Sequence, residues 1–448
     1  MFLIEKAKTF LQNDPLIRRV LRNSGYLFSS STISSALGLL QGILVIRLLG
    51  DSSFGLLAVI MDFPSNVNRL LSFRMSEVTV KYMGEALAQN DKQRASALVK
   101  GIGLTEAATS VLAYLVLLLL SVLGAQIFAK DWPADWVAYL FRFYGLFLLA
   151  NIVYETSVGV LQAFDHFKKV ALANFYQSIA LTALIAAAFL FEWDIFGVLT
   201  AYLIGKTIAG FLIAGYAIHD LNDKLGRDWM RTSLKLVPDW KPILRFAFST
   251  NLNGTVNLFA RDNIRLYLAA LLTTADVAYF ALATRLINLV MTPLEPFIWP
   301  TYAEITKTIA QKQWQATRKL LKQVSTIGLI WTLLAGGGLA LISWWLIPFM
   351  YGADMAPAYA CFIILLIGYG VANVANWNRP LLLALGRPNF PLIVSAITGA
   401  IEVALIFILV PAGGYLVGAA VVSGYFVISI GWTALRGISI IKHEEALA

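Results

Sequence analysis

Polar and charged side chains recur at helical spacing inside three of the most apolar stretches of this chain. Residues three or four positions apart lie on one face of an α-helix, so each set forms a polar stripe. A charge at bilayer depth costs at least a few kcal/mol unless it faces water or a partner. The stripes therefore predict a water-filled, positively charged interior. They are Asp62, Asn66 and Arg69; Asn253, Asn257, Arg261 and Arg265; and Arg285, Asn288, Thr292 and Glu295.

The composition is that of an integral membrane protein. Of its 448 residues 58% are hydrophobic and only 14% are charged, with a mean hydropathy of +0.71, whereas soluble domains carry about 25% charged residues. Nearly the whole chain consists of apolar runs of about 20 residues, the length of a membrane-spanning helix and twice that of a barrel strand. We predict an all-α bundle of about twelve transmembrane helices.

The net charge of +9 is concentrated in alternate loops. This distribution follows the rule that cytoplasmic loops are rich in lysine and arginine, so it predicts cytoplasmic termini and argues against a nucleic-acid partner. The intervening loops hold aspartate and glutamate, with Lys130 as their one basic residue. The basic segments lie at residues 81–100, 168–169, 224–241, 307–322, 387 and 436–442.

The residues that usually hold metals or drive catalysis are sparse. Cys361 is the single cysteine and lies in an apolar run, and the three histidines, His166, His219 and His443, are far apart. We therefore expect no disulfide and no metal site. A glycine-rich loop ending in Lys-Ser or Lys-Thr, which would bind ATP, is also missing from the sequence. We expect no cofactor and no catalytic residues.

A weak internal repeat divides the chain. Residues 88–93, Ala-Gln-Asn-Asp-Lys-Gln, resemble residues 310–315, Ala-Gln-Lys-Gln-Trp-Gln, at an offset of 222, close to half of 448. Six helices per repeat give two lobes related by a pseudo-twofold axis along the membrane normal, with a central cationic cavity between them. The predicted units are a cytoplasmic amphipathic segment (1–24), an N-lobe (25–218), a linker (219–242), a C-lobe (243–437) and a cytoplasmic tail (438–448).

Arginines outnumber acids along the stripes, which favours an anionic ligand, because guanidinium groups bind phosphate with two parallel hydrogen bonds. The alternative is that these arginines form internal salt bridges, Arg261 or Arg265 with Asp262, or Arg285 with Asp62. The candidate ligand-binding residues are Arg47, Asn66, Arg69, Asn253, Asn257, Arg261, Arg265, Arg285, Asn288 and Asn376.

Isolated carboxylates at membrane depth are candidates for ion coupling, since a buried acid can carry a proton. Glu402 is equally well explained as a hydrogen-bonding group, and Lys206 is a possible partner of Glu106 or Glu155. The coupling candidates are Asp62, Glu106, Glu155 and Glu295.

This pattern resembles the multidrug/oligosaccharidyl-lipid/polysaccharide exporter superfamily, and within it the Wzx-type flippases. The helix from Ser29 to Leu49 ends in Arg47-Leu48-Leu49-Gly50, and Phe54-Gly55 opens the next helix, as in the first hairpin of that family. The resemblance implies a multi-pass protein of the bacterial cytoplasmic membrane. Such a protein would move undecaprenyl-pyrophosphate-linked oligosaccharide across that membrane by alternating access, for surface polysaccharide synthesis.

The partners implied by the resemblance are the lipid-linked oligosaccharide, membrane lipids and the polymerase or chain-length proteins of the pathway, and we expect a monomer. Two alternatives stay open. One is a cation-coupled multidrug exporter of the same superfamily, which would need acidic sites for cationic drugs. The other is an integral-membrane glycosyltransferase or polymerase, which would need catalytic loops outside the membrane.

Overall fold

The first half of the chain folds into a bundle of long helices. The computed structural model describes residues 15–72, 75–259, 263–387 and 389–447; in these ranges the side chains of 15–28, of 447 and of several positions between 249 and 310 stay undescribed. The helices of this half are α2 (Pro15–Leu71), α3 (Met75–Ala88), α4 (Lys92–Phe128), α5 (Ala134–Gly145), α6 (Phe147–Ala150), α7 (Tyr154–Ala163), α8 (Phe167–Leu190) and α9 (Ile195–Lys224).

Two short 3-10 turns, η1 (Trp229–Arg231) and η2 (Leu234–Leu236), lead into the second half. Its elements are α10 (Lys241–Asn257), α11 (Ile264–Leu271), α12 (Thr274–Met291), η4 (Thr292–Phe297), α13 (Ile298–Ala310), α14 (Trp314–Trp331), η5 (Thr332–Gly337), α15 (Gly338–Tyr351), η6 (Ala353–Met355), α16 (Ala358–Val374), α17 (Asn378–Ala384) and α18 (Asn389–Leu447).

Nine helical stretches in the described ranges are long and apolar enough to cross a membrane. Two of them turn back on themselves, because Gly50 in α2 (φ 74°) and Gly414 in α18 (φ 68°) adopt left-handed backbone angles that favour glycine. α10 and α11 are not among these nine stretches. The protein is thus a multi-span membrane protein, and the predicted all-α class is confirmed.

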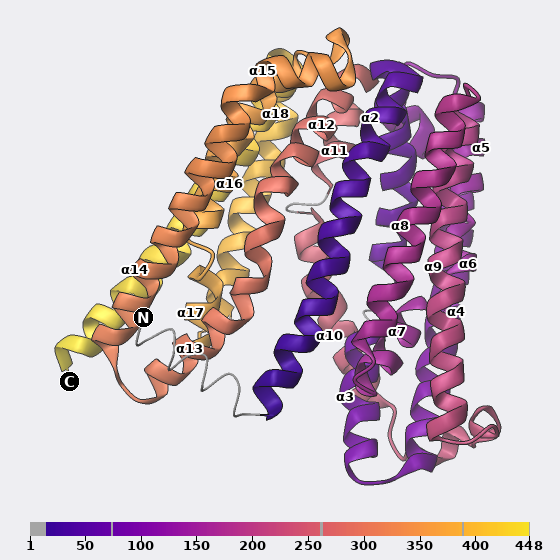
Figure 1. Ribbon diagram of the computed structural model, residues 1–448, viewed down its shortest axis with the longest axis vertical. Coiled ribbons are helices and arrows are strands. Elements are labelled where there is room, and N and C mark those ends of the chain that lie inside the picture. Colours follow the sequence, from indigo (N-terminus) through magenta and orange to yellow (C-terminus); the bar gives the residue numbers. More distant parts are fainter. Residues whose placement is uncertain (1–14, 73–74, 260–262, 388, 448) are drawn as a thin grey trace.

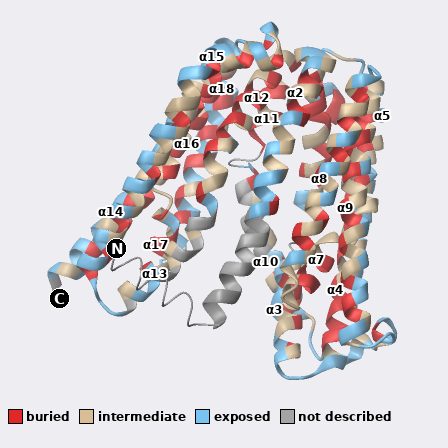
Figure 2. Cartoon of the chain, viewed as in Figure 1, coloured by how far each residue is buried: buried red, intermediate tan, exposed pale blue. Residues whose placement is uncertain are grey.

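The helices form two lobes (Figure 1). In the first, α2 packs on α8, α8 on α9, α3 on α7 and α4 on α5. In the second, α12 packs on α16, and α16 and α11 pack on α18, while α13 packs on α17. Buried residues follow the inner faces of these helices and exposed residues follow the outside (Figure 2). Many exposed side chains are large and apolar, among them Leu119, Leu341 and Leu435, as a lipid-facing surface requires.

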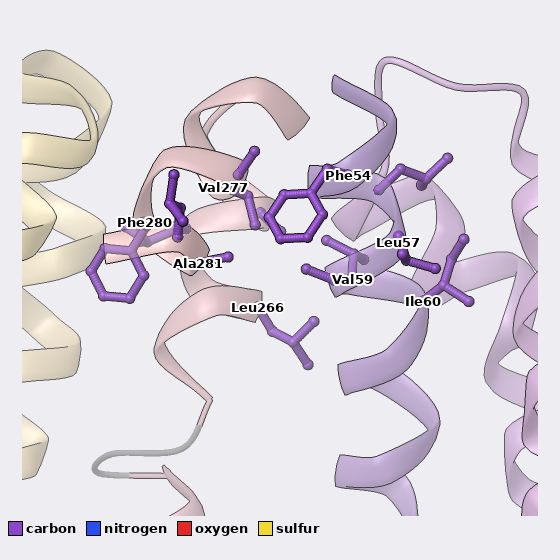
Figure 3. Close-up of a cluster of buried hydrophobic side chains, with 14 of the residues drawn as sticks. Phe54, Leu57, Val59, Ile60, Leu266, Val277, Phe280 and Ala281 are labelled. Atoms are coloured by element: carbon purple, nitrogen blue, oxygen red, sulfur yellow. The ribbon is translucent and has the colours of Figure 1, made fainter. Parts of the chain in front are cut away.

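The two lobes meet at one end of the molecule and diverge toward the other (Figure 1). The meeting end carries the acidic loops of the sequence and is called the acidic end; the other is called the basic end. Apolar side chains of α2, including Phe54 and Leu57, pack there with Val277 and Phe280 of α12 in one buried cluster (Figure 3). This contact is the main apolar junction between α2 and α12.

Polar contacts add to the junction at the acidic end. Ser52 Oγ lies 3.0 Å from Thr274 Oγ1, and the backbone N–H of Thr274 donates to Asp131 Oδ2 at 2.9 Å. At Gly55 the backbones approach so closely that a Cβ would lie 1.7 Å from the carbonyl oxygen of Thr274. Any larger residue at Gly55 must therefore separate the lobes or shift α2.

Arg47 closes the same end. Its guanidinium donates to the carbonyl oxygens of Met350, at 2.7 Å, and of Phe349, at the end of α15. Arg47 was predicted as a ligand-binding residue, and the structure places it in this inter-lobe contact instead of in the cavity described below.

Two of the predicted polar stripes do not follow continuous α-helices. In the stretch of the second stripe, α10 ends at Asn257 and α11 begins at Ile264. In the stretch of the third, α12 changes to the 3-10 turn η4 at Thr292, where Pro293 and Pro296 remove backbone donors. The described backbone thus does not continue α10 into α11 as one α-helix, and the side chains of Asn253, Asn257 and Arg261 lie outside the described residues.

A disulfide should capture the junction at the acidic end. In a Cys361→Ala background, Ser52→Cys with Thr274→Cys should oxidise readily, since the two hydroxyls are 3.0 Å apart. With a protease site inserted at Gly226, the two halves should stay linked after cleavage until a reductant is added. The single-cysteine variants serve as controls. Separation of the halves under oxidising conditions would contradict the junction.

Candidate functional site

A cavity of about 370 Å³ lies between the lobes. Its walls come from α2 of the first lobe and from α11, α12, α16 and α18 of the second. Aromatic rings of Phe280, Tyr369, Tyr425 and Phe426 line one part of it. Its polar lining consists of Asp62, Ser65, Asn66, Arg69, Arg265, Thr284, Asn288 and Glu402.

The first lobe contributes one face of α2. Asp62, Asn66 and Arg69 follow at intervals of four and three residues, and all three line the cavity. Pro64 lies inside the same helical segment. Proline removes a backbone hydrogen bond and favours a bend, so this wall of the cavity is less rigid than a regular helix.

An ion pair crosses the cavity from one lobe to the other. Arg265 Nη2 donates to Asp62 Oδ1 at 2.9 Å, with exposed side-chain fractions of 37% and 17%. The sequence suggested that Arg265 pairs with Asp262 or that Arg285 pairs with Asp62. The structure instead pairs Arg265 with Asp62. Because the arginine is substantially exposed, the pair contributes at most about 1 kcal/mol to stability. It is therefore easily exchanged for a ligand.

A second cross-lobe bond lies beside it. The amide of Asn66 donates from Nδ2 to Oδ1 of Asn263 at 2.5 Å, and each residue is only 8% exposed. A buried amide that loses its partner costs about 1–3 kcal/mol, so this bond favours the observed arrangement of the lobes.

The charged side chains of the cavity wall differ in how exposed they are. Among the described lining residues there are two arginines and two carboxylates. Arg69 and Asn288 are exposed, whereas Glu402 is 2% exposed and Asp62 is covered by Arg265. A molecule that enters the cavity therefore meets guanidinium and amide groups before it meets a carboxylate.

Other predicted residues lie elsewhere. Arg285 packs against α2, where a Cβ at Gly42 would fall 1.7 Å from its Nη1 atom, and it is not part of the cavity lining. Glu295 is exposed in η4, and Asn376 lies between α16 and α17. Glu106 and Glu155 line a separate cavity of the first lobe. The side chains of Asn253, Asn257 and Arg261 lie outside the described residues.

Sequence reasoning missed Asn263 as a site residue and left Glu402 undecided. Asn263 lies two positions before Arg265, off the assumed helical stripe, and the break between α10 and α11 turns it toward α2. The available signal for Glu402 was its isolation in an apolar run, which is also the signal of a buried hydrogen-bonding group. The structure places Glu402 on α18 in the lining of the cavity, where it is 2% exposed.

The sequence model of the family described as polysaccharide biosynthesis protein matches residues 20–299, well over half of the chain. This protein belongs to that family. A curated relative, the inner membrane protein YghQ of Escherichia coli K12, is 25% identical over 161 residues. That match spans 35% of this chain and 43% of the relative's length.

Solved structures with the same fold are transporters and a flippase. An inward-facing multidrug resistance MATE transporter of the MOP superfamily superposes with a TM-score of 0.73 at 15% identity, covering 92% of this chain and 96% of the other. The lipid II flippase MurJ, in an inward closed conformation, gives 0.70 at 17% identity, covering 93% and 89%. This member of the polysaccharide biosynthesis family therefore has the MOP-superfamily fold.

The bond between Asn66 and Asn263 should appear in a double-mutant cycle. Asn66→Leu and Asn263→Leu should each lower the melting temperature, because each leaves a buried amide unpaired at a cost of about 1–3 kcal/mol. The double variant should be destabilised by less than the sum. Additive losses in the purified protein would show that the two amides do not interact.

Proposed function

We propose that this protein is a flippase that moves a polyprenyl-pyrophosphate-linked oligosaccharide across the bacterial cytoplasmic membrane by alternating access, for surface polysaccharide synthesis. The observation that carries the proposal is the exposure of Arg69 and Arg265 in the inter-lobe cavity, above carboxylates that are covered. A diphosphate suits such a wall, since guanidinium groups bind phosphate oxygens in pairs and stay charged when desolvated.

Membership in the polysaccharide biosynthesis family and the likeness to MurJ and MATE folds support the transporter class. The loop charges support a basic end in the cytoplasm. In that orientation the acidic end is closed outward and the cavity is reached from the cytoplasmic leaflet. The structure is then the state that receives substrate.

The arrangement suggests how a diphosphate starts the conformational change. Its oxygens compete with Asp62 for Arg265, whose bond to Asp62 crosses between the lobes. Exchange of that partner leaves Arg265 bound to substrate and removes one inter-lobe bond. Substrate binding thereby lowers the barrier to moving one lobe against the other, which is the coupling that alternating access requires.

A membrane potential that is negative inside would assist this direction of transport. Moving one negative charge outward across 100 mV yields about 2.3 kcal/mol. An anionic headgroup held by the arginines thus gains energy on the way out.

Arginine variants test the proposal. Arg69→Ala should weaken stabilisation of the purified protein by inorganic pyrophosphate about 10- to 100-fold, the loss expected for a charge-assisted bond. Arg69→Lys should restore it only in part, because lysine lacks the planar fork. In cells, Arg69→Ala should accumulate lipid-linked oligosaccharide.

The matched control is Arg231→Ala, whose side chain is 87% exposed in the linker and contacts Asp228. It should leave binding and export unchanged. A multidrug exporter would behave differently: a lipophilic cation, such as tetraphenylphosphonium, would stabilise the protein, and pyrophosphate would not. That result would replace the flippase by the multidrug alternative.

Orientation is tested by labelling in a Cys361→Ala background. Asp354→Cys, in the acidic-end loop, should react with an impermeant thiol reagent added outside intact cells. Arg227→Cys, in the linker, should react only after permeabilisation. Both positions are exposed, so access is decided by the membrane and not by packing. The reverse pattern would invert the proposed topology.

A further inference from the structure

A cavity of about 320 Å³ lies in the second lobe and shares no lining residue with the central cavity between the lobes. Its wall is formed by the end of α17 and by both parts of α18, which turns back at Gly414. These parts are called the first arm (389–413) and the second arm (415–447). The lining includes Arg387, Asn389, Phe390 and Ile393 around the start of the first arm, and Arg436 and Ile440 of the second.

The cavity lies at the depth where the apolar core of a bilayer ends. Gly414 is at the acidic end, where the ring of Tyr415 contacts Tyr279 of α12. Asn389 precedes Gly414 by 25 residues and Arg436 follows it by 22. At 1.5 Å per residue these helices rise about 37 and 33 Å, slightly more than the ~30 Å of the hydrocarbon core. The cavity is therefore at the basic end, where α18 also ends (Figure 1).

The two arginines of the cavity have no acidic partner. No carboxylate is among the lining residues, and within the described part of the chain neither Arg387 nor Arg436 forms an ion pair. Glu445, farther along the second arm, pairs with Arg318 of α14 at 2.9 Å instead. The guanidinium Cζ atom of Arg436 lies 6.0 Å from the ring centre of Phe390. The cavity thus carries two positive charges that an anion would balance.

An apolar surface continues from the cavity toward the middle of the membrane. Ile393 in the cavity wall is 55% exposed, and Ile397, one turn farther along the first arm, is also exposed. On the second arm Trp432 and Ile428 are exposed one and two turns inward from the cavity. Tryptophan is typical of the interface between membrane and water. A ligand that fits this surface is anionic at one end and apolar along the rest.

We propose that this cavity binds the phosphate headgroup of an anionic glycerophospholipid from the leaflet at the basic end. Guanidinium groups bind phosphate oxygens in pairs, and basic pockets between helices at this depth suit such headgroups. The phosphate contacts Arg387 and Arg436, while the acyl chains follow the exposed side chains of the two arms. A soluble phosphate would use the arginines alone. The lipid is a neighbour and not a cargo, so the proposal does not rest on the proposed function.

Binding is measured on the purified full-length protein in a neutral detergent, as the rise in melting temperature with added lipid. Dioleoyl-phosphatidylglycerol should stabilise the wild type at a lower mole fraction than dioleoyl-phosphatidylcholine. Arg387→Gln with Arg436→Gln should raise the half-saturating mole fraction of phosphatidylglycerol about tenfold or more, since two charge-assisted bonds are lost. The matched control, Arg227→Gln with Arg231→Gln, removes two exposed charges from the linker and should leave the response unchanged.

A second variant keeps the test decisive if the double variant is unstable. Asn389→Asp conserves shape and adds a negative charge to the same cavity wall. An acidic residue suits the start of a helix, so the lipid-free protein should melt no lower than the wild type. Binding of phosphatidylglycerol should weaken severalfold. Asn90→Asp, the same change in the exposed turn before α4, is its control.

Three results would overturn the proposal. Equal stabilisation by inorganic phosphate and by phosphatidylglycerol at one concentration would show a site for a free anion. Equal stabilisation by the two lipids would show that the charge of the headgroup is not recognised. An unchanged preference for phosphatidylglycerol in the double arginine variant would place the lipid elsewhere on the protein.

This proposal and the proposed function fail separately. Arg69→Ala should lose pyrophosphate binding and keep the response to phosphatidylglycerol, whereas the double variant of Arg387 and Arg436 should do the reverse. Loss of the lipid response in Arg69→Ala, with the double variant unaffected, would place the lipid in the central cavity and overturn the site proposed at the basic end.

Discussion

Every charged group at membrane depth must face water or a partner, and this constraint organises the structure. Asp62 and Arg265 meet each other across the lobes, Glu106 caps α7, and Lys206 lies against aromatic rings. None of these solutions is possible for a single helix in lipid, since each needs a second element. The polar residues thereby specify which helices pack together. The apolar outer faces do not, because the outer face of one helix suits lipid as well as that of another.

The two lobes contact each other at the acidic end through polar contacts and a shared apolar cluster. The hydroxyl and backbone contacts are short-range and individually worth about 1 kcal/mol. Ser52 and Thr274, which touch, are 222 residues apart, the same offset as the repeat in the basic linkers. These two equivalent positions therefore meet near the pseudo-twofold axis. Separating the lobes at this end requires breaking these polar contacts and exposing the apolar cluster that α2 and α12 share.

The sequence was sufficient for the fold class because apolar length and loop charge are properties of segments. It also predicted that Asp62, Asn66 and Arg69 share one face and line the cavity, because their helix is continuous through the cavity wall. It failed where the backbone departs from the α-helix: the break before Ile264 turns Asn263 toward α2, and the prolines of η4 end the stripe of Arg285. The ion pair between Arg265 and Asp62 could not be predicted either, because the two residues are 203 positions apart and no local pattern relates them.

The mixed charge of the central cavity has a consequence for selectivity. A wall of arginines alone would hold a diphosphate too tightly to release it, and a wall of carboxylates would exclude it. Under the proposed function, a diphosphate would have to displace Asp62 from Arg265, and it would gain only the difference between two similar bonds. Affinity would be lost in that exchange, and Asp62 on α2 would lose Arg265 as a partner whenever substrate is bound.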